Sequence, residues 1–372
     1  MDETSHSRRQ GHGLAQGILP KQAIEALIAE GAIRLASPAA DGQAQPASLD
    51  LRLGQRAYRV RASFLPGRQK TMRERIAELS LHAIDLTNGA VLETGCVYIA
   101  ELQESLALPS SLAAAANPKS STGRLDVFTR VIADRAREFD IIDPGYHGPL
   151  YAEISPRSFP ILARTGSRLS QMRFRIGQAK LDDASLLELH HRETLVAARD
   201  PSIQGGVAVS VDLTGFDGDR LVGYRAKRHS GLIDVDRVRG YEIDDYWEPL
   251  HARDGTLILD PGQFYILASK EAVHVPPAYA AEMMPFDPLV GEFRVHYAGF
   301  FDPGFGHAPA GGSGARAVLE VRSRDVPFIL EDGQTVGRLV YERLSEPPQT
   351  LYGAALSSNY QGQRLKLSKH FR

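Results

Sequence analysis

The sequence predicts a mainly β protein that contains two copies of one β domain and a few short helices. The chain has 372 residues, and this length fits two domains, or one domain present twice, because domains commonly hold about 100–200 residues. Short strand-forming runs are separated by turns rich in the 34 Gly and 22 Pro residues, which is typical of β architectures. Segments of the first half also recur, in the same order, in the second half.

The N-terminal residues 1–16 are polar and lack the apolar stretch of a signal peptide, so they are predicted to form a disordered leader. Helical periodicity follows over residues 20–30, and a second short helix is predicted over residues 73–81. Strands are predicted from β-type composition at residues 47–54, 96–102 and 338–344.

The internal repeat is visible as aligned blocks. Residues 94–114 align without gaps with residues 261–281, which defines one constant offset between the halves. Three further pairs fit the series: Glu153 with Glu320 at the same offset, IDPGY (142–146) with FDPGF (301–305) at a slightly smaller offset, and SLDL (48–51) with SVDL (210–213). Such an ordered series indicates a duplication.

The repeat divides the chain into five parts. The boundaries predicted from it are a leader at 1–16, a first β domain at 17–177, a helix-prone connector at 178–206, a second β domain at 207–346 and a C-terminal tail at 347–372.

Composition excludes several classes of protein. A net charge of −2 offers no large positive field for nucleic acid, and no apolar run has the roughly 20 residues of a membrane span. Cys96 is the single cysteine, which excludes an intrachain disulfide and any CxxC metal motif. The histidines show no spacing typical of a metal site. We therefore expect a cytoplasmic protein that binds neither nucleic acid nor membranes.

The two copies differ in the segment whose side chains are best suited to bind a ligand. The first copy holds PKSSTGRLD at residues 118–126, a cluster of cations and hydroxyls that can face a phosphate chain. In the second copy, Pro285 falls opposite Ser120 and Leu289 falls opposite Arg124. The first copy is therefore predicted to be chemically intact and the second degenerate.

A second group of motifs follows in the first copy. VIADR at residues 131–135 precedes IDPGYHG at residues 142–148, which is predicted to be the tight turn of a β-hairpin. Glu153 lies in the returning strand among apolar residues, where it is either solvated or partly buried with a raised pKa. Strand alternation leaves both possibilities open.

Taken together, SSTGR, VIADR, IDPGYHG and the Glu ten residues after Asp143 resemble the motifs of dCTP deaminase, within the deoxyuridine triphosphatase-like superfamily. The resemblance covers most of residues 18–176 and, more weakly, residues 207–364. It implies two tandem distorted β-barrels. Single-domain members of the family are trimers whose sites are shared between subunits, so a homo-oligomer with a trimer-like arrangement of barrels is expected.

The resemblance also implies an activity and a role for each site residue. The activity is hydrolytic deamination of dCTP to dUTP and ammonia in pyrimidine deoxynucleotide metabolism. Glu153 would be the general acid and base, helped by Ser120 and Arg124. The expected substrate-binding residues are Lys119, Ser121, Ala133, Arg135, Asp143, Tyr352, Tyr360 and Gln363. The resemblance implies that the C-terminal tail, which holds the last three, closes over a site.

The expected chemistry needs no metal at the reacting carbon. Zinc deaminases hold their metal with a PCxxC motif, and a chain with one cysteine cannot provide it. The cofactor implied is Mg²⁺, bound mainly through the triphosphate of the nucleotide.

Three alternatives stay open. The chain is also compatible with a dUTP diphosphatase or a bifunctional deaminase and diphosphatase, which would use the same phosphate cradle. A non-catalytic nucleotide sensor on the same fold is a further alternative.

The carboxylate that meets Ser120 and Arg124 is either Glu153 of another chain or a residue of the second copy such as Glu320.

Overall fold

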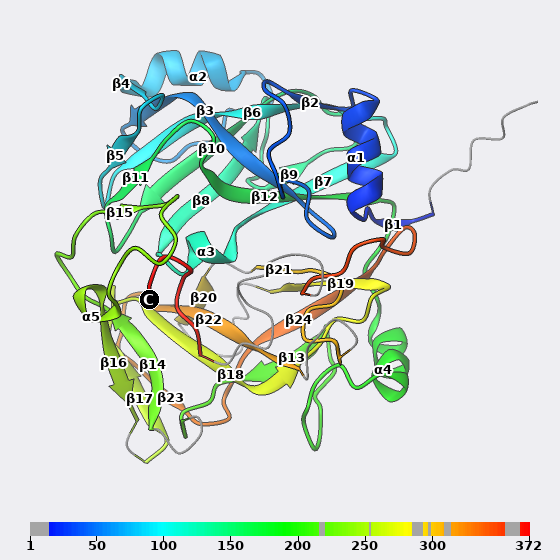
Figure 1. The fold of residues 1–372 in the computed structure, drawn as a ribbon, viewed down its shortest axis with the longest axis vertical. Helices are drawn as coiled ribbons and strands as arrows, with labels where there is room; N and C mark the ends of the chain where they lie inside the picture. The colour runs from blue at the N-terminus through cyan, green and yellow to red at the C-terminus, as the bar shows by residue number, and fades with distance from the viewer. Residues whose placement is uncertain are drawn as a thin grey trace, which may run out of the picture.

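The computed structural model describes residues 15–215, 220–252, 254–284, 293–296, 299–308, 314–353 and 365–372. Strands dominate both halves, so the mainly β prediction is confirmed (Figure 1). The first half is blue to green and the second half is green to red in Figure 1, and the two halves pack against each other. Within the described residues, no helix is long and apolar enough to cross a membrane.

The first half is built around one large antiparallel sheet. Its strands follow the order β8-β10-β6-β3-β12-β7-β9, with β1, β2 and β4 paired at the sides. The elements are β1 (Gly17–Ile18), α1 (Lys21–Ala29), β2 (Ile33–Leu35), β3 (Leu49–Val60), α2 (Met72–Leu79), β4 (Ser80–Asp85), β5 (Ala90–Leu92), β6 (Val97–Ala107), β7 (Leu112–Pro118), α3 (Ser120–Gly123), β8 (Val127–Ala133), β9 (Ile141–Ile142), β10 (His147–Pro156), β11 (Ile161–Ala163) and β12 (Arg168–Ile176).

The second half forms smaller sheets with the orders β13-β24-β19-β21, β16-β14-β18-β22-β20 and β17-β23. Its elements are α4 (Asp183–Arg192), β13 (Val207–Ser210), β14 (Leu221–Ala226), β15 (Ile233–Asp234), α5 (Ile243–Tyr246), β16 (Trp247–His251), β17 (Thr256–Leu259), β18 (Tyr265–Val273), β19 (Tyr279–Met283), β20 (Phe293–His296), β21 (Phe300–Phe301), β22 (Ala315–Ser323), β23 (Phe328–Glu331) and β24 (Thr335–Arg343). Strand β15 pairs in parallel with β11 of the first half.

Both predicted N-terminal helices form. Helix α1 buries Ala23, Ile24 and Leu27, as its apolar spacing requires. Helix α2 begins with a capping box in which Thr71 and Glu74 satisfy each other's backbone amides. The predicted strands at 47–54, 96–102 and 338–344 correspond to β3, β6 and β24.

The two halves repeat one another in hydrogen-bond register. Glu153 pairs with Ile99 between β10 and β6, and Glu320 pairs with Ile266 between β22 and β18, so both partners keep the constant offset found in the sequence. The same offset relates two turns, because the Tyr98 hydroxyl accepts from the Glu93 amide at 3.0 Å and the Tyr265 hydroxyl accepts from the Asp260 amide at 2.9 Å. Equivalent residues thus occupy equivalent places in two copies of one fold.

The alignment of SLDL with SVDL is wrong in register. The backbone amide of Arg52 donates to Glu104 at 2.8 Å, and the amide of Ser210 donates to Glu271 at 2.9 Å. Because Glu104 and Glu271 are equivalent, Ser210 takes the place of Arg52 and not that of Ser48. A match of four residues was too short to align these two strands correctly, because the pairing of each strand with its neighbour contains a register shift.

A continuous apolar core joins the copies. Phe159 of the first copy packs edge-on against Trp247 of the second, with ring centroids 5.4 Å apart, and both side chains are fully buried. Phe371, near the C-terminus, also packs against Trp247 at 5.8 Å. The chain end therefore returns to the boundary between the copies, where Figure 1 shows the red C-terminal segment beside α3.

Candidate active site between the two copies

The segment predicted to hold phosphates forms α3, a single helical turn. The amide of Gly123 donates to Lys119 O at 2.9 Å, and the amide of Arg124 donates to Ser120 O at 3.1 Å. These two amides are used within the turn. The side chains of Lys119, Ser120 and Ser121 belong to the cluster of cations and hydroxyls that the sequence predicts to face phosphates.

Arg124 points from the end of this turn towards the second copy. Its side chain is buried, and its Nε lies 3.7 Å from Oε1 of Glu320. Its Nη1 donates to the backbone oxygen of Lys366 at 2.9 Å. The guanidinium therefore joins three segments that are far apart in sequence, one from each copy and one from the C-terminal segment.

Glu320 is a buried carboxyl in the middle of β22. Its strand lies between β18 and β20, opposite Ile266 and His296. Burial raises the pKa of Glu320 to about 8, although the positive charge of Arg124 acts in the opposite direction. A carboxyl that holds its proton near neutral pH beside a fixed cation is suited to both donating and accepting a proton.

Glu153 occupies the equivalent place in the first copy but has a different partner. Its Oε1 accepts from Arg130 Nη2 at 2.8 Å, whereas its buried Oε2 has no hydrogen-bond partner among the described residues. Arg130 lies opposite Glu153 in the β8–β10 ladder. Arg124, by contrast, contacts Glu320 of the second copy. Within one chain, Glu153 and Arg124 therefore have different partners.

Several cations gather around α3. Lys119 forms an ion pair with Asp50, and Arg168 lies 3.5 Å from the same carboxylate. Burial, and then the nearby charge of Lys119, lowers the pKa of Lys369. Burial, and then Arg124, lowers the pKa of Lys366. Cations gathered in this way create a positive potential that an anionic ligand would relieve.

The C-terminal segment lies directly over α3. Ser368 Oγ donates to the backbone oxygen of Ser121 at 2.8 Å and contacts His370 Nδ1 at 2.8 Å. The ring of His370 contacts the Val235 carbonyl at 2.9 Å through Nε2. Residues 365–372 thus cover this side of the site.

The other predicted tail residues are placed differently. Tyr352 lies on the second copy, where its amide donates to Pro303 O at 2.8 Å and its ring packs 5.8 Å from Phe305. Tyr360 and Gln363 lie outside the described residues.

The predicted nucleotide-reading residues of the first copy meet in a separate cavity. Ala133, Arg135 and Asp143 line a cavity of about 520 Å³. The hairpin predicted around the DPGY turn is wrong, because within the described chain β9 pairs with β7 while β10 pairs with β6 and β8. The turn forms, with the Tyr146 amide donating to Asp143 O at 3.2 Å, but its flanking strands separate to different neighbours. Antiparallel β8 and β10 support this region instead.

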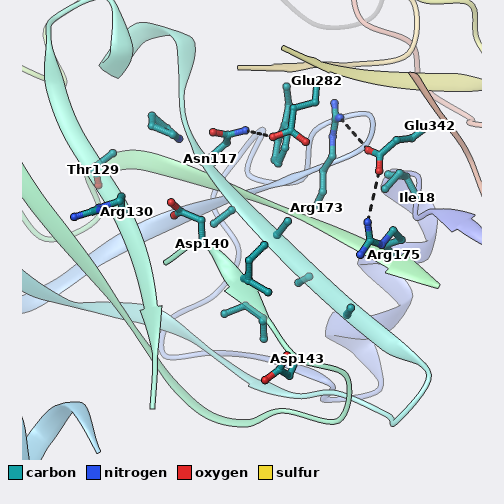
Figure 2. Close-up of a pocket in the computed structure, with 18 of the residues that line it drawn as sticks. Ile18, Asn117, Thr129, Arg130, Asp140, Asp143, Arg173, Arg175, Glu282 and Glu342 are labelled. Carbon is teal, nitrogen blue, oxygen red and sulfur yellow. Dashed lines mark hydrogen bonds and ion pairs between the residues drawn. The ribbon is translucent and has the colours of Figure 1, made fainter. Parts of the chain in front are cut away.

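A second cavity, of about 580 Å³, lies between the copies (Figure 2). On one side Asn117 donates to Glu282 at 2.7 Å, and on the other are Arg130 and Asp140. Burial raises the pKa of Asp140 to about 7, against the effect of its hydrogen bond from the Val131 amide. Arg130, the partner of Glu153, therefore faces a cavity to which both copies contribute.

The sequence predicts Lys119, Ser120 and Arg124 as site residues and Glu153 as the catalytic carboxyl, and the structure brings Arg124 together with Glu320. That contact is one of the alternatives left open by the sequence. The repeat carries a signal for it, because Glu320 retains the strand position of Glu153. Lys366 and Lys369, which approach Arg124 and Lys119, were not predicted, since lysines near a terminus have no distinguishing pattern.

The fold and site define a class of tandem β-barrel proteins with a charged site between the barrels. The model of the 2'-deoxycytidine 5'-triphosphate deaminase N-terminal domain matches residues 15–178, and that of the C-terminal domain of the same family matches residues 182–371. The chain therefore belongs to the dCTP deaminase family.

Individual relatives agree with this assignment. The crystal structure of 2'-deoxycytidine 5'-triphosphate deaminase from Agrobacterium tumefaciens superposes with a TM-score of 0.86 and 62% identity, covering 89% of this chain and 99% of that one. A "dCTP deaminase, dUMP-forming" from Beutenbergia cavernae is 34% identical over 30% of this chain and 56% of its own length. A "dCTP deaminase" from Halorubrum lacusprofundi is 29% identical over 36% of this chain and 64% of its own length. The chain thus spans less than two thirds of these two curated relatives.

Proposed function

We propose that this protein hydrolytically deaminates dCTP to dUTP and ammonia at a site made by both copies of the barrel. The observation that carries the proposal is the buried contact between Arg124 of the first copy and Glu320 of the second. The second copy lacks the cation, because Leu289 falls opposite Arg124, and in the first copy Glu153 contacts Arg130 instead. The contact of Arg124 with Glu320 therefore needs both copies.

In the proposed reaction, a water molecule attacks C4 of the cytosine. Glu320 gives its proton to N3, and the resulting carboxylate takes a proton from the attacking water and passes it to the amine. The C4–N bond then breaks and ammonia leaves, while the C4 hydroxyl becomes the carbonyl of uracil and returns its proton to Glu320. Arg124 and Ser120 orient the water and stabilise the charge that develops on it. The raised pKa of Glu320 supports this role, because the group starts protonated below about pH 8.

The cations around α3 would bind the triphosphate. Lys119 and Ser121 lie in the predicted phosphate segment, and Lys366 and Lys369 approach it from the C-terminal segment. Mg²⁺ would arrive with the nucleotide and be held by its phosphate oxygens. Tyr360 and Gln363 would close over the bound nucleotide, as the sequence predicts.

A second location for the chemistry is Glu153. Its unpartnered Oε2 favours this alternative, because a buried carboxylate oxygen usually has a hydrogen-bond partner, and this one has none among the described residues. In that case Ala133, Arg135 and Asp143 would read the nucleotide, and Ser120 and Arg124 would come from another chain of a homo-oligomer. The Arg124–Glu320 site, in contrast, is complete within one chain, so the expected oligomer is not required for it.

The product distinguishes the remaining functions. Purified protein incubated with dCTP and Mg²⁺ should release dUTP and ammonia in equal amounts, which chromatography and an ammonia assay would measure. Release of dUMP and pyrophosphate would instead indicate the bifunctional reaction, which is favoured by the name of the Beutenbergia relative. Pyrophosphate release from dUTP without deamination of dCTP would indicate a diphosphatase. Nucleotide binding without turnover would indicate a sensor.

A further inference from the structure

Three potential metal ligands meet on the second copy, in a cluster separate from the groups described above. They are Glu193, His274 and His307, and one ligand atom of each lies within 4.8 Å of the others. All three side chains are half-buried. Glu193 follows helix α4 in the connector, His274 follows β18, and His307 follows β21. Three separate segments thus converge on one point.

Backbone hydrogen bonds hold these segments in place. The amide of His274 donates to Leu195 O at 3.0 Å, which fixes the end of β18 against the connector. The amide of Val275 donates to Phe305 O at 2.8 Å, and the amide of His307 donates to Gly304 O at 3.1 Å. The ligand atoms are therefore presented by ordered backbone, as a binding site requires.

The two imidazoles of the cluster lie next to each other. The ring centroids of His274 and His307 are 5.6 Å apart, and a ligand atom of each lies close to the Glu193 carboxylate. Neutral imidazole is the commonest metal ligand among protein side chains.

The cluster is not a remnant of the duplicated framework. At the constant offset between the copies His274 falls on Ala107, and counting from the DPG turns His307 falls on Gly148. The first copy therefore has no side chain with a ligand atom at either position. The third member has a counterpart, because the hydrogen bond from the His274 amide to Leu195 O repeats that from the Ala107 amide to Ala32 O, which places Glu193 opposite Glu30. The two histidines are what the second copy adds.

We propose that Glu193, His274 and His307 bind one divalent transition-metal ion of the zinc class, with water completing the coordination. Two imidazoles and one carboxylate match the ligand preference of Zn²⁺ and Co²⁺. The ion would fasten the connector to the second barrel. It takes no part in the deamination, so this proposal stands or falls independently of the proposed function.

The distances are compatible with such an ion. At metal–ligand bonds of about 2.0–2.2 Å, the ligand atoms of a tetrahedral site lie about 3.3 Å apart. Ligand atoms within 4.8 Å of one another need to approach by about 1.5 Å at most, which small side-chain rotations can provide. Because no change in the backbone is needed, binding should be rapid and reversible.

The test uses tag-free, full-length protein treated with chelator and then dialysed. His6 and His12 of the leader are replaced by Ala throughout, so that they cannot bind the probe. Co²⁺ is titrated and its visible absorption recorded, and Zn²⁺ is then added in competition. The variants are His274→Ala, His307→Ala and Glu193→Gln, with His191→Ala, an exposed residue of α4, as the matched control.

We expect one equivalent of Co²⁺ to bind with tetrahedral absorption and to be displaced by Zn²⁺. His274→Ala and His307→Ala should each weaken Co²⁺ binding by more than about tenfold, whereas His191→Ala should not change it. Zn²⁺ should also raise the midpoint of thermal unfolding in the parent protein but not in His307→Ala, because a ligand of the native state stabilises it. Absence of stoichiometric binding, or unchanged affinity in His274→Ala and His307→Ala, would overturn the proposal.

Discussion

Arg124 and Glu320 meet across the boundary between the two barrels, with Arg124 Nε 3.7 Å from Glu320 Oε1. Both side chains are buried, and the C-terminal segment covers the arginine through Lys366 O. A buried cation beside a carboxyl that keeps its proton combines groups that neither barrel brings together alone. The geometry of this pair leads to the first two predictions.

Glu320→Gln should lower kcat for dCTP deamination by about 10²–10⁴-fold, because an amide cannot carry the proton. Glu153→Gln is the matched control, since Glu153 occupies the equivalent strand position in the first copy. Ammonia release, measured alongside nucleotide binding, should fall far more in Glu320→Gln than in Glu153→Gln. The opposite order would move the chemistry to Glu153.

Mixing variants tests whether the site lies within one chain. Arg124→Ala mixed with Glu153→Gln should show no more activity than the two proteins assayed separately, because the Arg124–Glu320 pair belongs to one chain. Recovery of activity on mixing would indicate instead a site shared between Glu153 of one chain and Arg124 of another. Native mass measurements on the same mixture would establish whether hybrid oligomers had formed.

The stability of the protein should depend on the titration of Glu320. Its pKa rises from an ordinary value of 4.5 to about 8 on folding, so the native state binds the proton more tightly than the unfolded state does. This stabilisation is fully present below about pH 4.5 and decreases as the pH rises to about 8.

Glu320→Gln, which resembles the protonated form, should lack this dependence. Relative to the parent protein, it should gain at most about 1.4 kcal/mol in free energy of unfolding per pH unit across that window. Urea unfolding at pH 5, 6.5 and 8 measures the difference. If the free energies of unfolding of the two proteins differed by the same amount at all three pH values, the raised pKa of Glu320 would be contradicted.

Arg173 should be a major stabilising residue of the boundary. Its guanidinium donates to Ala281 O and Phe301 O, each at 2.9 Å, and its side chain is 2% exposed. Arg173→Met leaves these buried acceptors without a donor, so the free energy of unfolding should fall by about 3–5 kcal/mol.

Arg175→Met is the control for this variant. Arg175 lies on the same strand and 3.9 Å from Glu342, but its side chain is 46% exposed, and the change should cost about 0–1 kcal/mol. Chemical denaturation of both variants tests the contrast. Equal losses would mean that the boundary does not depend on Arg173.

Ser368 should secure the C-terminal segment on α3. Ser368→Ala removes the hydrogen bond to Ser121 O and should cost about 1–3 kcal/mol, because the acceptor stays buried. If the segment helps to bind the triphosphate, KM for dCTP should also rise.

Ser345→Ala serves as the comparison. The buried Ser345 hydroxyl has no hydrogen-bond partner among the described residues, so its removal should change stability by no more than about 0.5 kcal/mol. Denaturation and steady-state kinetics on both variants measure the two effects. A KM that is unchanged in Ser368→Ala would separate the segment from nucleotide binding.

Much of the fold could be read from local patterns. The spacing of Ile24 and Leu27 predicted α1, and β-type composition between turn residues predicted β3, β6 and β24. The constant offset between the copies predicted equivalent positions for Glu153 and Glu320. These features depend on residues close in sequence, or on similarity between copies, and both are visible in one chain.

The partnership at the site depended on how the two barrels pack. Arg124 was recognised from its motif, but its contact with Glu320 depends on the orientation of one barrel against the other. The same holds for Lys366, and for His274 with His307 and Glu193, because no periodicity records a contact between distant segments. Local sequence thus predicted the elements and the candidate site residues that they carry. Burial and long-range packing selected which groups meet and which carboxyl keeps its proton.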